Sequence, residues 1–226
     1  MIPSKLKELI KKIIGAKYEW QSHIDNIICI FDKNLKTYNP HNILDVGSGD
    51  GSRTLIMAKY FNIEPRNIYG IDCENKYIVE TREIFNAEKI DLERDLLPYE
   101  DESFDLITCN QVLEHLKNYR KAIDEVIRVS KKGGYIAFGI PNLAHLMNRI
   151  YLLLGTQPLC ILLNGPHVRG YTHSSFFEIL NSIDRLKLVD YTGSIMYPLP
   201  LVVGKFLAKH FVGLSGYTCY LLQKIR

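Results

Sequence analysis

Two aspartates and alternating glycines stand in the segment LDVGSGDG, residues 44–51. Glycine lets the backbone turn sharply and lets a ligand approach the chain closely. The segment follows an apolar strand pattern and precedes a helix pattern, and open α/β sheets bind ligands beyond the carboxyl ends of such strands. Ser52 stands where the dinucleotide motif GxGxxG has its third glycine. Because Asp45 and Asp50 would repel a pyrophosphate and attract an ammonium or sulfonium group, the loop favours a cationic ligand.

A third carboxylate, Asp72, ends the next apolar stretch, IYGID, 21 positions after Gly51. An acidic residue at this place accepts hydrogen bonds from the ribose hydroxyls of a bound nucleoside. The alternative is that Asp72 only caps a helix that starts near Asn75. A ribose contact together with a glycine loop that suits a cation indicates S-adenosylmethionine as the ligand.

The segments that must position these residues alternate between strand and helix patterns from residue 42 onward. The predicted strands are Ile43–Val46, Asn67–Ile71, Phe104–Cys109, Gly134–Ile140, Leu186–Tyr191 and Tyr217–Leu222, with a weaker one at Lys89–Leu92. The predicted helices are Ser52–Phe61, Asn75–Phe85, Tyr119–Val129 and Ser174–Asn181, with Ser174 as the last N-cap and Gly133–Gly134 ending the third. This alternation predicts a mostly parallel sheet covered on both faces. The last two strands lack a clear helical crossover, so we expect them to be antiparallel.

Four segments in this order resemble the class I S-adenosylmethionine-dependent methyltransferases of the small-molecule type. They are ILDVGSGDG, IYGID, DLLPYEDESFDLITCNQVLEHL and VIRVSKKGGYIAFGIPN, and the resemblance covers residues 42–142. It implies a single α/β domain at residues 42–226, with a Rossmann-like, seven-stranded, mostly parallel sheet, an antiparallel last strand and helices on both faces. It also implies a methyltransferase that uses S-adenosylmethionine and releases S-adenosylhomocysteine. Residues 1–41 would form an N-terminal helical extension over the cofactor site.

The resemblance assigns one group of residues to the methionine end of the cofactor. These residues are Asp45, the backbone of Gly47, Ser48 and Gly49, and the pair Asn110 and Gln111 after the fourth strand.

A second group would hold the nucleoside. Asp72 would accept from the ribose hydroxyls, and Cys73 would line the adenine. Asp91 would accept a hydrogen bond from the adenine amino group, and Leu92 would offer its backbone N–H. Which carboxylate faces the adenine stays open, because Glu93 and Asp95 lie close to Asp91 in the sequence.

The chain departs from two patterns of the wider superfamily. Enzymes that methylate amides or exocyclic amines carry an Asn/Asp-Pro-Pro-aromatic tetrad after the fourth strand, where this chain reads CNQV at residues 109–112. Other relatives bind a divalent metal through a Glu-x-x-Glu-His cluster, and the equivalent residues are Gln111, Glu114 and His115. Since a neutral amide replaces one carboxylate, we expect no metal site. Glu114 and His115 would instead form a hydrogen-bonded helix start, with His115 left open as a pocket residue.

Two long, leucine-rich connections are candidates for the acceptor side, at residues 141–172 and 195–216. They are too apolar to be disordered, so they form either a lid over an apolar or lipid-like acceptor, or ordinary helices that cover the sheet edge or a dimer interface. The stretch GPHVRGYTHSSF brings three candidate bases, His167, Tyr171 and His173. Histidine titrates near neutral pH, so His167 and His115 are the predicted catalytic bases, with a packing role as the alternative for each.

The composition of the chain limits the kinds of partner that it could bind and the setting in which it works. The net charge of +3 is too small to argue for nucleic acid, and no run of eighteen apolar residues could span a bilayer. Five widely spaced cysteines without a CxxC pair, and no signal-peptide pattern, fit a cytoplasmic setting. An amphipathic helix with Leu6, Leu9, Ile10, Ile13 and Ile14 on one face carries lysines on the other, which leaves peripheral membrane contact open beside simple packing.

The leading hypothesis is a methyltransferase that acts on a small, largely apolar or lipid-like acceptor. Two alternatives remain from the sequence alone. One is an RNA or protein methyltransferase docked by the basic N-terminal helix, and the other is a domain that binds the cofactor without catalysis.

Overall fold

The computed structural model describes residues 16–226, of which residues 16–23 and Leu159 are described by their backbone only. The predicted N-terminal amphipathic helix around Leu6–Ile14 lies outside the described residues. Within them, no helix has the length and apolar character needed to cross a bilayer.

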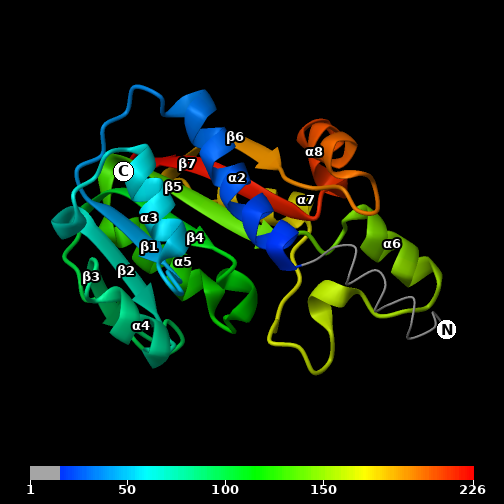
Figure 1. Ribbon diagram of the computed structural model, residues 1–226, viewed down its shortest axis with the longest axis horizontal. Coiled ribbons are helices and arrows are strands. Elements are labelled where there is room, and N and C mark those ends of the chain that lie inside the picture. Colours follow the sequence, from blue (N-terminus) through cyan, green and yellow to red (C-terminus); the bar gives the residue numbers. More distant parts are fainter. Residues whose placement is uncertain (1–15) are drawn as a thin grey trace.

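Seven strands form one sheet (Figure 1). They are β1 (Ile43–Val46), β2 (Ile68–Asp72), β3 (Asn86–Lys89), β4 (Phe104–Asn110), β5 (Ser130–Pro141), β6 (Leu186–Gly193) and β7 (Tyr217–Lys224). Their order is β3-β2-β1-β4-β5-β7-β6. β7 is antiparallel to both of its neighbours, β5 and β6, and the other pairings are parallel. The predicted mostly parallel, seven-stranded Rossmann-like sheet with an antiparallel last strand is confirmed.

The α-helices that cover the sheet occupy both of its faces. The α-helices are α2 (Ala16–Asn34), α3 (Ser52–Tyr60), α4 (Asn75–Thr81), α5 (Tyr119–Val129), α6 (Leu146–Leu153), α7 (His173–Asn181) and α8 (Leu201–His210). Of these, α6 lies beyond the strand ends rather than on a face of the sheet (Figure 1). One buried cluster joins α5 and α7 to the sheet through residues such as Val126 and Phe176. The other joins α2, α3 and α4 to the opposite face through residues such as Phe31, Met57 and Ile78. Figure 1 shows α2 and α3 lying across the same face of the sheet.

The order of the strands puts the switch point of the sheet between β1 and β4. The chain runs outward from β1 to β2 and β3, then returns to place β4 on the other side of β1. Loops that leave the carboxyl ends of strands on either side of such a point diverge and form a crevice. The glycine loop after β1 and the loop after β4 therefore border the same crevice.

Four local predictions need correction. β3 is Asn86–Lys89 rather than Lys89–Leu92, because this polar segment pairs with β2 while the apolar side chain of Leu92 is buried beyond the strand. α4 ends at Thr81, before Phe85. The N-cap of α7 is Thr172 rather than Ser174, because the Thr172 hydroxyl accepts from the Ser175 N–H in a capping box. The Gly133–Gly134 pair lies inside β5, where strand pairing shifts register, and α5 already ends at Val129.

Candidate active site

The glycine loop is fastened to the end of β2 by its own backbone. The N–H groups of Gly47 and Ser48 donate to the Ile71 carbonyl at 2.8 and 2.9 Å. The Gly49 N–H donates to the Asp72 Oδ2 atom at 2.9 Å, and the Glu74 N–H donates to Asp72 Oδ1 at 2.9 Å. Each carboxylate oxygen of Asp72 keeps a further lone pair, since an ionised carboxylate can accept about four hydrogen bonds. Asp72 thus orders the loop and can still accept from two hydroxyls.

Glycine is required at position 47 for two reasons. Its φ of +78° lies in the left-handed region, and a Cβ atom there would meet Val112 Cγ2 at 2.3 Å. The loop after β4 therefore packs directly against the glycine loop. Gly49 also has a positive φ, of +54°, but a Cβ there would meet nothing within 4 Å. Open space thus lies beside the loop at Gly49.

Asp45 is buried at the centre of the sheet and holds three elements together. Its two oxygens accept from the hydroxyls of Thr54 on α3 and Thr108 on β4, at 2.6 and 2.7 Å. Burial raises the pKa of Asp45, and the hydrogen bonds from the two threonines act in the opposite direction. Its expected contact with the methionine end of a cofactor stays a prediction.

The residues expected to line the nucleoside follow the ends of β2 and β3. Cys73 is exposed beside Asp72, and partial burial together with that carboxylate raises the pKa of its thiol. Asp91 accepts from the Glu93 N–H at 3.1 Å through one oxygen, while the Arg94 guanidinium lies 3.4 Å from the other. Leu92 is buried. The segment after β3 therefore turns back on itself beside Asp72, where the Ile90 N–H donates to the Asp72 carbonyl.

Two side-chain amides at the end of β4 have donors without partners. Asn110 is buried, and its Nδ2 atom has no hydrogen bond within the described structure; the same holds for Nε2 of Gln111. Gln111 has a φ of +59°, and its N–H donates to the Gly139 carbonyl at 2.9 Å. A buried donor that lacks an acceptor is costly, so these amides fit a ligand that carries a carboxylate. Together with the open space at Gly49 and the free lone pairs of Asp72, they fit S-adenosylmethionine.

The loop after β4 continues into a short 3-10 helix, η2 (Leu113–His115), that contains Glu114. Glu114 is fully buried, and neither of its carboxylate oxygens has a hydrogen-bond partner among the described residues. Burial raises its pKa to about 8, and the nearby Arg53 guanidinium acts in the opposite direction. The expectation that Glu114 belongs to a hydrogen-bonded helix start holds for its backbone carbonyl, which accepts from Val168 and Arg169, but not for its side chain.

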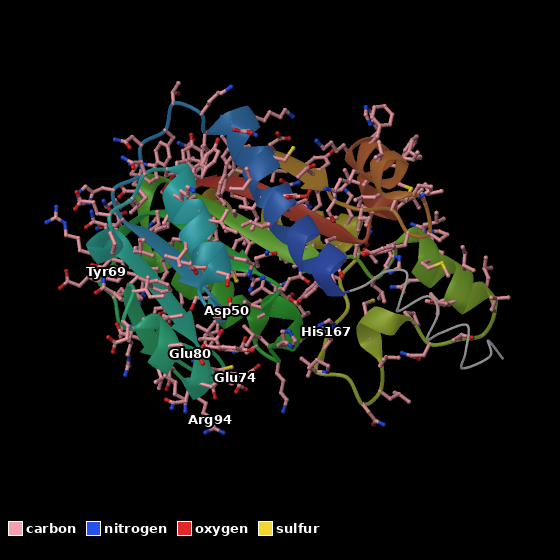
Figure 2. All side chains as sticks on the ribbon, viewed as in Figure 1. Asp50, Tyr69, Glu74, Glu80, Arg94 and His167 are labelled. Atoms are coloured by element: carbon pink, nitrogen blue, oxygen red, sulfur yellow. The ribbon has the colours of Figure 1, made fainter. Side chains whose placement is uncertain are left out.

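Residues 166–171 hydrogen-bond to η2, and this contact brings His167 beside His115. The two rings lie edge to face, with centroids 4.7 Å apart. The Nδ1 atom of His115 lies 3.2 Å from the Pro166 carbonyl, and Nδ1 of His167 lies 2.6 Å from the Cys160 carbonyl. A carbonyl oxygen can only accept, so both Nδ1 atoms carry a proton, and in a neutral ring of this tautomer Nε2 has the lone pair. In Figure 2, Asp50, Glu74 and His167 all lie in the lower middle of the view, with His167 to the right of the other two.

The other two candidate bases of this stretch serve the packing. The Tyr171 hydroxyl donates to the Leu113 carbonyl at 3.2 Å, and its ring is buried. His173 begins α7, where its Nδ1 lies 2.8 Å from the hydroxyl of Tyr220 and its ring stacks on that tyrosine. Burial lowers the pKa of His173. These contacts supply the packing role that the sequence left as the alternative.

Both apolar connections present large side chains to solvent. Leu153 at the end of α6 is 87% exposed, Leu163 is 93% exposed, and Val202 on α8 is 81% exposed. Figure 1 places α6 and α8 beyond the carboxyl ends of β5 and β6. Neither segment contains an aspartate or a glutamate. That the two segments line one acceptor pocket stays a prediction.

The structure brings the loops of the predicted cofactor residues together at one edge of the sheet, and the roles of those residues stay predictions. Glu114 was expected only to be part of a hydrogen-bonded helix start beside His115. That neither of its carboxylate oxygens has a partner among the described residues could not be read from any local pattern. The contact between Val112 and Gly47 is likewise a tertiary feature.

Comparison with known proteins gives matches in sequence. Residues 44–138 match the family model described as a methyltransferase domain. An uncharacterized methyltransferase of Bacillus subtilis, YcgJ, is 36% identical over 42% of this chain and 38% of its own length. A ubiquinone biosynthesis O-methyltransferase of Coxiella burnetii is 25% identical over 72% of this chain and 70% of its own. The chain spans 38% and 48% of the first two curated relatives that it matches.

Solved structures share the fold over a larger part of the chain. A possible histamine N-methyltransferase from Thermotoga maritima superposes with a TM-score of 0.60 at 16% identity, covering 98% of this chain and 95% of that one. At this identity the likeness concerns the fold, which therefore extends over nearly the whole chain.

Proposed function

We propose that this chain, which belongs to the class I S-adenosylmethionine-dependent methyltransferases, transfers a methyl group to a small, largely apolar acceptor. Its membership rests on the methyltransferase domain at residues 44–138. The cofactor supplies a methyl group made electrophilic by its sulfonium. The protein must therefore hold the acceptor atom in line with that group, and positioning supplies most of the rate.

One observation supports this function above the others. The loop after β4 joins the cofactor side to a polar cluster within six residues. Asn110 at its start offers an unpartnered donor, Val112 packs against Gly47 of the glycine loop, and His115 at its end lies against His167. An acceptor held between these two ends would lie next to the cofactor. The free Nε2 atoms of the histidines would accept the proton of an acceptor hydroxyl.

The apolar character of the acceptor rests on the connections around this cluster. Residues 146–163 hold one charged side chain, Arg149, and residues 199–214 hold Lys205 and Lys209. Burying a few of their exposed leucine, valine or phenylalanine side chains against an acceptor would contribute about 1.5–3 kcal/mol each. The Coxiella relative is named an O-methyltransferase, which supports an oxygen atom as the acceptor.

Binding of S-adenosylhomocysteine tests the cofactor assignment. The wild-type protein should bind it in calorimetry, and Asp72→Ala should weaken binding at least tenfold, since hydrogen bonds to a charged group contribute about 1.5–3 kcal/mol. Asp184→Ala is the matched control, because this exposed aspartate pairs only loosely with Arg226, at 3.7 Å. Equal affinity of the Asp72 and Asp184 variants would contradict the assignment.

Turnover with a panel of acceptors tests the rest. Release of S-adenosylhomocysteine should be fastest with apolar molecules that carry one hydroxyl, and His167→Ala should lower the rate while leaving cofactor affinity nearly unchanged. Methylation of RNA or protein alone would refute the small acceptor. Cofactor binding without consumption of any acceptor would refute catalysis.

A further inference from the structure

Helix α8 turns its small residues inward and its large apolar residues outward. Its buried residues are Gly204 and Ala208, and a Cβ atom added at Gly193, the last residue of β6, would meet the Ala208 carbonyl at 2.4 Å. Val202 and Phe206 lie one turn apart on the opposite side of the helix, and both are exposed. A helix that covers a sheet normally turns its apolar side toward the core. The outward side of α8 therefore has no partner within the described part of the chain.

Helix α6 shows the same inversion. Asn148 is fully buried in it, whereas Leu152 and Leu153 are exposed, as is Leu154 directly after the helix. Leu163, in the loop between α6 and α7, is exposed as well. The three most exposed large apolar side chains of the described residues are Leu163, Leu153 and Val202, so all three belong to the two leucine-rich connections.

The two connections are tied together at their base. The side-chain amide of Asn142, just before α6, donates to the carbonyls of Gly213 and Ser215 at 3.0 and 2.8 Å, and its backbone N–H donates to the Gly216 carbonyl at 2.9 Å. Figure 1 shows α6 and α8 at the same end of the molecule. We call their exposed apolar side chains the α6–α8 surface. Its members, which are 59–93% exposed, are Leu152, Leu153, Leu154, Leu163, Val202 and Phe206.

The charges beside this surface have one sign. Residues 141–172 and 195–216 contain no aspartate or glutamate. The exposed Arg149 lies one turn before Leu153, and the exposed Lys209 lies three residues after Phe206, on the outward side of α8. Neither cation forms an ion pair within residues 16–226. The surface thus combines aliphatic side chains with cations that have no carboxylate partner.

We propose that the α6–α8 surface docks on a bilayer that contains anionic phospholipids. A small molecule has too little area to cover side chains that protrude from two helices and a loop, whereas the apolar phase of a bilayer is continuous. The cores of protein–protein interfaces are enriched in aromatic residues, methionine and arginine. Leucine, valine and phenylalanine beside lysine and arginine are instead typical of elements that lie in the membrane interface. This inference concerns docking and stands independently of methyl transfer.

The two kinds of side chain would divide the docking between them. The leucines and valine would enter the boundary between headgroups and acyl chains, where their area leaves water. Arg149 and Lys209 would lay their aliphatic stems along this apolar surface and hold their charges at the level of the headgroups. Attraction between these cations and anionic lipids would add to the apolar contribution, and salt would weaken that part alone.

Co-sedimentation of the whole chain with vesicles tests the surface. The wild type should bind vesicles of phosphatidylcholine mixed with phosphatidylglycerol. The triple variant Leu153→Ser, Leu163→Ser, Val202→Ser should bind at least about 100-fold more weakly, since the burial of each such side chain favours binding by roughly tenfold or more. Arg149→Gln with Lys209→Gln should weaken binding by about fivefold for each charge removed. On vesicles of phosphatidylcholine alone, this second variant should bind like the wild type.

Matched controls change the same kinds of side chain elsewhere. Val79→Ser with Leu96→Ser removes two apolar side chains that are 59% and 61% exposed outside the two connections. Lys36→Gln with Lys132→Gln removes two exposed cations outside them. Both control variants should bind vesicles like the wild type. Thermal unfolding and the binding of S-adenosylhomocysteine should be unchanged in every variant, which shows that a loss of docking is not a loss of fold.

Three outcomes would overturn the proposal. The first is a wild type that does not bind vesicles containing phosphatidylglycerol. The second is equal binding by the triple variant and its apolar control, which would place the contact on another part of the chain. The third is a wild-type dimer in light scattering that the triple variant converts to a monomer, without vesicle binding by either, which would show that the surface meets a second copy of the chain.

Discussion

Replacing Gly47 by alanine probes the contact between the two loops that border the crevice. Alanine at position 47 must keep the backbone φ of +78°, which costs about 1–2 kcal/mol for a residue other than glycine. The Cβ atom of this alanine would also meet Val112 Cγ2 at 2.3 Å, and relieving such overpacking typically costs about 1–3 kcal/mol. We therefore expect Gly47→Ala to lower the free energy of unfolding by about 2–5 kcal/mol.

A second substitution separates the two costs. Val112→Ala in the Gly47→Ala background should recover the stability that is lost through overpacking, but not the stability that is lost through backbone strain. A double-mutant cycle in urea should therefore show favourable coupling of about 1–3 kcal/mol. Gly49→Ala is the control, because its φ is also positive but its Cβ would meet nothing within 4 Å. It should cost about 1–2 kcal/mol and show no coupling to Val112. Equal costs at both glycines, without coupling, would refute the packing described between the loops.

Two other predictions concern buried and half-buried charges. Burial raises the pKa of Asp105, but hydrogen bonds from the Asn42 N–H and the Lys131 ammonium outweigh it and lower the pKa below 3.8. The stability that Asp105 contributes is thus present above its unfolded pKa and is lost as the pH falls through the lower pKa of the folded state. Asp105→Asn should lower the free energy of unfolding by about 1.5–3 kcal/mol at pH 7. The urea midpoints of the wild type and the variant should converge in acid. Arg128 donates through two nitrogens to the Glu125 carboxylate, so Arg128→Ala should cost about 3–5 kcal/mol and Arg128→Lys should restore only part of it in thermal unfolding. Full recovery by lysine would show that charge alone, without the paired geometry, is sufficient.

The parts of the fold that the sequence predicted well are those with strong local patterns. β1 reads ILDV, and all four of its residues are buried, as a central parallel strand requires. The antiparallel pairing of β6 and β7 was predicted from the lack of a clear helical crossover; the pairing is confirmed, although the connection does contain a helix, α8. β3 was misplaced because its residues, NAEK, carry little apolar signal. Edge strands of this kind are specified by pairing with their neighbour rather than by their own composition.

The candidate site was predictable only where function needs a local motif. The glycine loop and Asp72 depend on conformations and spacing that can be read along the chain. His167 was selected for its chemistry, but its position beside His115 depends on hydrogen bonds between residues 166–171 and η2. The same segment donates from Val168 and Arg169 to the Glu114 backbone carbonyl. Tertiary contacts of this type leave no mark in periodicity.

The position of β7 between β5 and β6 has a consequence for synthesis on the ribosome. β6 hydrogen-bonds to β7 alone among the strands, so it has no strand to join until residues 217–224 have been made. Through the time needed to translate α8, β6 and the nascent edge of β5 both expose unpaired backbone groups, and such edges template association between chains. The half of the sheet that holds the glycine loop can pair β1 to β5 earlier. Slow translation or truncation after β6 should therefore yield aggregates seeded by β5 and β6, while the glycine-loop half is already formed.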